Sequence, residues 1–171
     1  MTRILGIDPG SLMTGYGIID SEGQMLRYVD CGCVRTAGGE LTERLKAIYY
    51  GIGKVVSTYG PDEIAVERAF VHKNADSALK LGQARAAAIC GTLVKPVPLH
   101  EYTPRAVKLS VVGKGGAGKD QVQHMVKVLL GLKGDLQADS ADALAVALCH
   151  AHNRALKLKL DRLAAAAEGR R

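Results

Sequence analysis

The stretch Ile4-Leu5-Gly6-Ile7-Asp8-Pro9-Gly10 decides the fold. Its apolar residues have strand character, and Pro9-Gly10 is a turn pair that cannot extend a central strand. The sequence therefore predicts a strand that ends on Asp8, with the carboxylate at the edge of a sheet. Taken alone, an Asp-Pro-Gly sequence fits equally an aspartate that merely begins a turn.

The length of the chain predicts a single domain, and its net positive charge is compatible with a polyanionic binding partner. The chain has 171 residues and a formal charge of +6, and this length can bury one substantial core. No apolar run approaches the roughly 20 residues of a membrane-spanning helix, and the first residues do not read as a signal peptide. We therefore expect a cytoplasmic protein with no membrane partner. The four cysteines lack paired ligand spacing, which predicts reduced thiols.

Hydrophobic patterning predicts an α/β domain with a mixed central sheet flanked by helices, in which three leading strands are antiparallel. After the first strand, strands at 14–19 and 25–34 are joined by a turn at 20–23. Further strands are expected at 63–67 and 97–100, and helices at 40–59, 76–95, 103–111, 119–130 and from 139 past 156.

Four acids stand at the ends of predicted elements. Asp8 and Glu67 each end a strand, and Asp139 and Asp142 lie three residues apart in the first turn of the last helix, hence on one face. Capping of that helix explains the last two acids equally well. If all four converge, their repulsion is tolerable mainly when cations neutralise it. An all-oxygen set suits Mg²⁺ or Mn²⁺, and two such ions about 3.5–4 Å apart support phosphoryl transfer to water.

Five motifs follow one another along the chain: GIDPG at 6–10, TGYG at 14–17, AVE at 65–67 followed by Phe70, QVQHM at 121–125 and ADSADALA at 138–145. Together they resemble the RuvC family of bacterial Holliday junction resolvases, over about residues 2–152 and in the family's order. The resemblance implies a ribonuclease H-like nuclease domain at 1–157, a homodimer, and Mg²⁺-dependent cutting of two like-polarity strands at a four-way junction in recombination and DNA repair. It also implies a RuvA-RuvB branch-migration complex as partner.

The resemblance also implies roles for single residues. It gives catalytic and metal-binding roles to Asp8, Glu67, Asp139 and Asp142, and leaves Asp139 open between ligand and acid/base because some relatives have a histidine there. The tail at 158–171 lies outside the resemblance, and we expect it to be a basic helix end that frays.

DNA contacts are expected from one aromatic and several basic residues. Phe70 matches an aromatic that family members use against unpaired bases, and Lys108 and Lys119 match basic residues beside the scissile phosphate. Arg68 stands where a glutamine is known in a relative. Further DNA contacts are expected at Lys73, Arg105 and Lys114.

The glycine-rich segment 113–120 nearly spells the nucleotide-binding motif G-x-x-x-x-G-K-[ST]. Asp120 stands where that motif needs a hydroxyl for Mg²⁺, and an acid there would repel phosphates. A basic loop near DNA fits the segment better. The five histidines have no ligand spacing and are expected to be surface or packing residues.

Three rival classes share parts of this pattern. A strand, an aspartate, a glycine turn and a second strand also occur in actin-like ATPases, but those enzymes need two related lobes. A non-catalytic nucleic-acid-binding module would place four acids where they repel DNA. Another ribonuclease H-like nuclease remains the nearest alternative, and the late acid pair with the Phe70 loop favours the resolvase. The helix at 76–95 is the expected dimer face.

Overall fold

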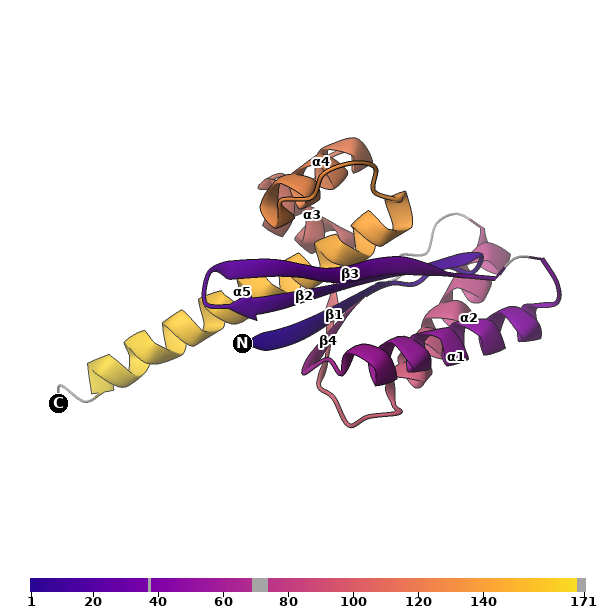
Figure 1. Ribbon diagram of the computed structural model, residues 1–171, viewed down its shortest axis with the longest axis horizontal. Helices are drawn as coiled ribbons and strands as arrows, with labels where there is room; N and C mark the ends of the chain where they lie inside the picture. Colours follow the sequence, from indigo (N-terminus) through magenta and orange to yellow (C-terminus); the bar gives the residue numbers. More distant parts are fainter. Residues whose placement is uncertain (37, 69–73, 169–171) are drawn as a thin grey trace.

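A five-stranded mixed sheet with helices on both faces forms the protein (Figure 1). This computed structural model describes residues 1–36, 38–68 and 74–168, with side chains to residue 165. The elements are β1 (Thr2–Asp8), β2 (Met13–Glu22), β3 (Met25–Arg35), α1 (Leu41–Tyr59), β4 (Glu63–Glu67), α2 (Ala75–Thr92), β5 (Leu99–Tyr102), α3 (Pro104–Val112), α4 (Lys119–Leu130) and α5 (Ala138–Glu168).

The strands lie in the order β3-β2-β1-β4-β5. β1, β2 and β3 pair antiparallel, while β4 is parallel to both β1 and β5. The predicted mixed sheet with three antiparallel leading strands is thereby confirmed. Because β1 and β4 are parallel neighbours, their carboxyl ends meet at the same edge of the sheet.

Alternate residues of β1 enter two separate cores. Leu5 and Ile7 pack with Ile52 of α1 in a cluster that also contains buried alanines of α2. Ile4, on the opposite face, packs with Leu144 of α5 in a cluster that also contains residues of α3 and α4. The sheet therefore separates a layer of α1 and α2 from a layer of α3, α4 and α5, as Figure 1 shows.

Several element boundaries differ from the sequence-based expectations by a few residues. The hairpin turns at residues 23–24 rather than 20–23, because Gly23 has a φ of 63° and supplies the left-handed conformation. β5 begins two residues later than expected, and α2 ends at Thr92 rather than at residue 95. The helix predicted before the glycine-rich loop is present as α3, so this segment lacks the strand that a nucleotide-binding motif requires there.

The sequence predicted a basic helix end that frays over 158–171, and this fraying stays a prediction. Helix α5 continues past residue 156, as expected, and extends through Glu168. Alanines at 164–167 have the highest helix propensity of any residue, which favours this extension. Figure 1 shows the C-terminal half of α5 projecting beyond the sheet. None of the described helices has the length and apolar composition that crossing a membrane requires.

Candidate active site

Asp8 and Glu67 are neighbours at the ends of two parallel strands. β1 and β4 pair with Gly6 opposite Ala65 and Ile7 opposite Val66, so the next residues of the two strands adjoin. Both acidic side chains are partly buried. Since side chains alternate along a strand, Asp8 and Glu67 share the face on which Gly6 and Ala65 meet α5. Two carboxylates therefore lie side by side beneath this helix.

Glycines in the sheet bring the acidic start of α5 close to these carboxylates. A Cβ atom at Gly6 would lie 2.2 Å from the carbonyl oxygen of Ala143, and one at Gly15 would lie 2.1 Å from that of Asp139. Gly15 is the direct partner of Asp8 across β1 and β2. The absence of side chains at these glycines thus lets the first turn of α5 settle on the strand pair that ends with Asp8.

Asp142 extends the acidic group and binds a lysine. It lies three residues after Asp139, on the same face of α5, and its Oδ2 atom is 3.3 Å from the Nζ atom of Lys119, the first residue of α4. The Asp142 carboxylate raises the pKa of Lys119, mainly through its charge and also through this hydrogen bond. The Lys119 side chain is 75 % exposed, so the ammonium group remains accessible to another anion.

Burial and mutual repulsion change the titration of the acids. Burial raises the pKa of Asp8 to about 8, and the negative charges of Glu67, Asp142 and Asp139 add to the increase. Burial likewise raises the pKa of Glu67, with a further contribution from Asp142 and an opposing one from Lys119. The three other predicted acids therefore all act on Asp8.

A cavity of about 400 Å³ opens onto this group. Asp8, Glu67 and Asp142 line it together with the predicted DNA-contacting residues Lys108 and Lys119. Carboxylates suited to a divalent cation and ammonium groups suited to phosphate thus face the same space. The cavity can accept a phosphodiester at the carboxyl edge of the sheet.

The other predicted DNA contacts lie around this cavity or outside the described residues. Arg68 lines the cavity, and its Nε atom donates a hydrogen bond to Glu101 at 3.4 Å. Phe70 and Lys73 fall outside the residues that the structure describes, so their expected contacts stay predictions.

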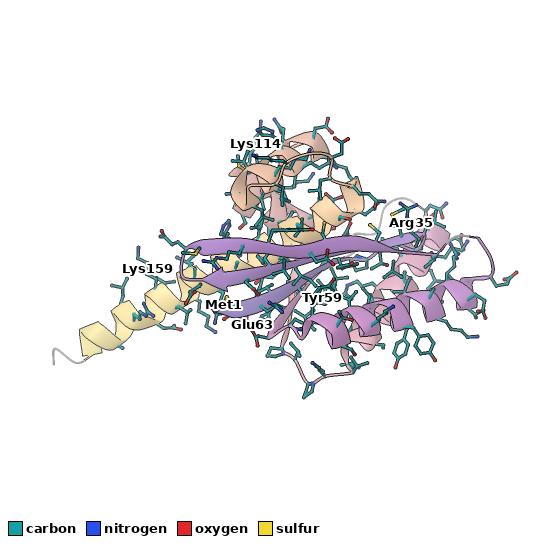
Figure 2. The ribbon with its side chains drawn as sticks, viewed as in Figure 1. Met1, Arg35, Tyr59, Glu63, Lys114 and Lys159 are labelled. Atoms are coloured by element: carbon teal, nitrogen blue, oxygen red, sulfur yellow. The ribbon has the colours of Figure 1, made fainter. Side chains whose placement is uncertain are left out.

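Arg105 and Lys114 belong to the α3 and α4 region. Arg105 is exposed on α3 and packs against the glycine-rich segment, where a Cβ atom at Gly115 would lie 2.8 Å from its Cγ atom. Lys114 is exposed within the same segment, on the side of the molecule away from α1 (Figure 2). Their DNA contacts also stay predictions.

A second polar group lies away from the predicted site residues, and no motif in the sequence indicated it. Glu63, His100 and His150 come together at the opposite end of β4 from Glu67, with ligand atoms within 4.8 Å of one another. His150 is only 3 % exposed, so it belongs to the packing histidines that the sequence led us to expect, but it also carries a polar contact with Glu63. No local spacing indicates this group, because its members are brought together only by the pairing of β4 with β5 and the packing of α5.

Comparison with known proteins gives a consistent family. Residues 4–150 match the family model described as crossover junction endodeoxyribonuclease RuvC. The RuvC of Methylococcus capsulatus is 55 % identical over 163 residues, covering 95 % of this chain and 98 % of that protein. The RuvC of Marinobacter nauticus is 52 % identical over 162 residues, covering 95 % and 93 %.

Solved structures agree with this result. The structure described as T. thermophilus RuvC in complex with Holliday junction substrate superposes with a TM-score of 0.84 at 31 % identity, covering 92 % of this chain and 97 % of that one. The match confirms the predicted ribonuclease H-like fold. The yeast mitochondrial Holliday junction resolvase Ydc2, with a TM-score of 0.66 and 12 % identity, shares the fold. The chain belongs to the RuvC family of crossover junction endodeoxyribonucleases.

Proposed function

We propose that this protein is a structure-selective DNA endonuclease that resolves four-way (Holliday) junctions by hydrolysing two phosphodiester bonds, in recombination and DNA repair. Its family and the junction-bound relative from T. thermophilus support this function. The observation that carries it is the meeting of Asp8, Glu67 and Asp142 with two lysines around one cavity. Asp139 supplements this group through its charge on Asp8.

The four carboxylates would hold Mg²⁺ or Mn²⁺, and we propose two ions per site. The residues fit such ions, because the donors are all oxygen atoms. Burial and the neighbouring negative charges raise the pKa of Asp8, and a bound cation would favour its charged form. When bound, the metal supplies an activated water and stabilises the charge on the leaving oxygen.

The surrounding residues orient the substrate. Lys108 and Lys119 face the same cavity as the acids, so their ammonium groups can hold the scissile phosphate against the carboxylates. The ion pair with Asp142 positions Lys119 before DNA arrives. Arg68 adds positive charge at the same opening, and its bond to Glu101 connects β5 to the end of β4.

A homodimer suits this reaction, because two sites related by a dyad match the dyad of a four-way junction. We propose α2 as the dimer face, since Leu79 on this helix is 64 % exposed. By family resemblance, the protein would act in the cytoplasm with a RuvA-RuvB branch-migration complex.

Cleavage of a synthetic junction tests the proposal. Purified protein with Mg²⁺ should convert a labelled four-way junction into paired, symmetrically nicked duplexes and leave a linear duplex of the same sequence intact. Cleavage of RNA in an RNA–DNA hybrid instead would indicate another ribonuclease H-like nuclease. ATP hydrolysis would indicate an actin-like ATPase. Equal cutting of linear and branched DNA would contradict junction selectivity.

Lys119→Gln should weaken junction binding across all sequences. Removing one phosphate contact should reduce the slope of log affinity against log salt by about one. Binding titrations between low and moderate salt, with an uncleavable junction in Ca²⁺, measure this slope. The matched control is Lys54→Gln, because Lys54 is exposed on α1 across the sheet and should leave the slope unchanged. An unchanged slope for Lys119→Gln would remove Lys119 from the phosphate contacts.

A further inference from the structure

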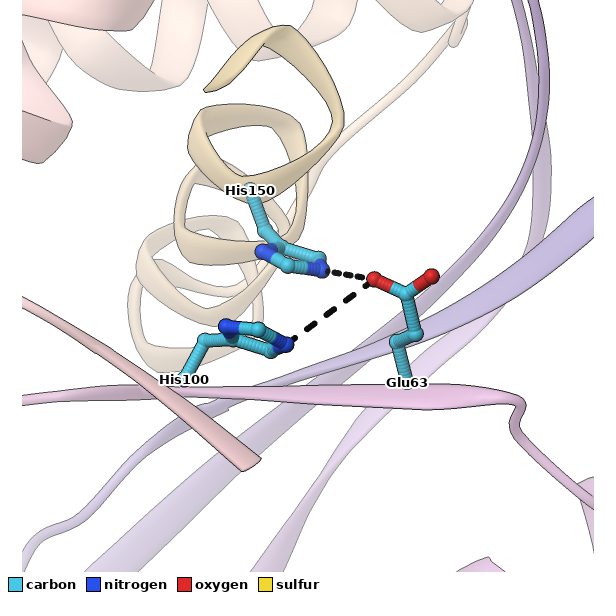
Figure 3. Close-up of side chains that lie close together, drawn as sticks. All are labelled: Glu63, His100 and His150. Atoms are coloured by element: carbon cyan, nitrogen blue, oxygen red, sulfur yellow. Dashed lines mark hydrogen bonds and ion pairs between the residues drawn. The ribbon is translucent and has the colours of Figure 1, made fainter. Parts of the chain in front are cut away.

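Glu63, His100 and His150 form a compact group away from the candidate active site (Figure 3). The Oε2 atom of Glu63 lies 2.6 Å from the Nε2 atom of His150 and 4.0 Å from that of His100. The two imidazole rings face each other with centroids 4.4 Å apart. Three potential ligand atoms therefore point toward one another from three different elements.

Strand register creates this arrangement. Glu63 begins β4, and Ala65, two residues further on the same face, pairs with His100 of β5. α5 packs over this face and places His150 above the two strands. Glu67 lies four steps along the strand from Glu63, a distance of about 13 Å at the usual rise per residue, so the group is distinct from the catalytic acids.

Neighbouring polar residues orient two of the three side chains. The Tyr102 hydroxyl lies 2.8 Å from the Nδ1 atom of His150, and the Nε atom of Arg154 donates a hydrogen bond of 2.8 Å to the Oε1 atom of Glu63. These contacts leave His150 Nε2 and Glu63 Oε2 as the inward atoms. A hydroxyl can accept as well as donate, so Tyr102 accommodates the Nδ1-protonated form of His150 that a metal on Nε2 requires.

We propose that Glu63, His100 and His150 bind a divalent transition metal, with Zn²⁺ as the best-suited ion. Two imidazoles and one carboxylate are a known zinc ligand set. Bond lengths of about 2.0–2.1 Å place the ligand atoms of a tetrahedral site about 3.3 Å apart. The distances of 2.6 Å and 4.0 Å lie on either side of this value, and all three ligand atoms lie within 4.8 Å of one another, so side-chain adjustments without backbone movement can bring them to a common ion.

The protonation states are also suitable. Burial lowers the pKa of His150, and the facing His100 contributes, which favours a neutral imidazole. Although burial alone would raise it, the hydrogen bonds from Arg154 and His150 keep the pKa of Glu63 below its usual value. Arg154 adds a positive charge, but it occupies Oε1 and leaves Oε2 for the ion.

Such a metal would connect β4, β5 and α5, and its fourth position would be open. A cavity of about 560 Å³ borders the group, so water can complete the coordination. Because the metal would bind the folded chain in preference to the unfolded one, it should raise the melting temperature in proportion to the logarithm of its concentration.

Metal titration of the tag-free, chelator-stripped protein tests the proposal. Isothermal titration should show one Zn²⁺ site per chain that Mg²⁺ does not fill, and His100→Ala should weaken it by more than the roughly 10- to 100-fold that loss of an outer-shell contact costs. His152→Ala is the matched control, because His152 lies on the same helix but binds Ser110 at 3.1 Å. It should leave Zn²⁺ affinity unchanged.

Two further variants separate this site from other ligands. Asp8→Asn should bind Zn²⁺ as the wild type does, because Asp8 ends β1 at the carboxyl edge of the sheet, whereas Glu63 begins β4 at the opposite edge. A Cys31→Ser/Cys33→Ser double variant should also retain the site, and Co²⁺ should give tetrahedral d–d absorption without a thiolate charge-transfer band. Equal Zn²⁺ binding by wild type and His100→Ala, or loss of binding only in Asp8→Asn or the cysteine variant, would overturn the proposal.

Discussion

Asp8→Asn should reduce the rate of junction cleavage by about 10³-fold or more, while leaving junction affinity within a few-fold of wild type. Such a loss of rate equals about 4 kcal/mol of transition-state stabilisation. Asp8 is buried, and the charges of Glu67, Asp142 and Asp139 all act on its pKa. An amide has one acceptor oxygen and no charge, so it cannot replace a carboxylate as a ligand for a hard cation. Single-turnover cleavage and binding in Ca²⁺ measure the two properties separately.

The stability of the same variant serves as its folding control. A carboxyl group whose pKa rises from 3.8 to about 8 on folding contributes stability below pH 4, and this contribution is lost as the pH approaches 8. Without metal, Asp8→Asn should therefore be increasingly more stable than wild type as the pH rises from 4 to 8, as thermal melts can show. Retained cleavage would contradict the role of Asp8, whereas a lower melting temperature at pH 8 would contradict its burial among like charges.

Gly15→Ala should impair both stability and cleavage. A Cβ atom at this position would lie 2.1 Å from the carbonyl oxygen of Asp139 and 2.7 Å from its carbonyl carbon, so the backbone of α5 has to move. Overpacking of this kind costs about 1–3 kcal/mol. A displacement of about 1 Å at a catalytic group can cost about 100-fold in rate, so cleavage should fall further than stability alone explains.

The matched control is Gly82→Ala in α2, where a new Cβ atom meets nothing within 4 Å. Alanine in an exposed helix should stabilise the protein by up to about 1 kcal/mol, the opposite sign to Gly15→Ala. Chemical denaturation and cleavage rates for both variants make the comparison. A Gly15→Ala protein with wild-type stability and rate would show that α5 does not need this close approach.

Much of the architecture follows from local sequence patterns. The strand that ends at Asp8, the capped start of α3 and the stripe of α1 all depend on nearby residues, and the structure has each of them. The error at the hairpin concerns local competition, because Gly23 moves the turn. It does not depend on a long-range contact, but on small differences in free energy between turn positions that patterning does not resolve.

The two polar groups differ in how visible they are in the sequence. Asp8 and Glu67 were recognisable because each ends a strand before a turn or loop, and Asp139 with Asp142 because of their helical spacing. Glu63, His100 and His150 carry no such signal. Their proximity depends on the β4–β5 register and on how far α5 extends along the sheet, which are tertiary quantities.

The acids of the candidate active site are far apart in the order of synthesis. Asp8 belongs to β1, which is synthesised well before α5, the helix that carries Asp139 and Asp142. Until α5 packs on the glycines of β1 and β2, the chain has only part of the acidic group that we propose as cation ligands. We therefore expect a polypeptide without α5 to be incapable of cutting DNA, so that nuclease activity appears only once α5 has packed on the sheet.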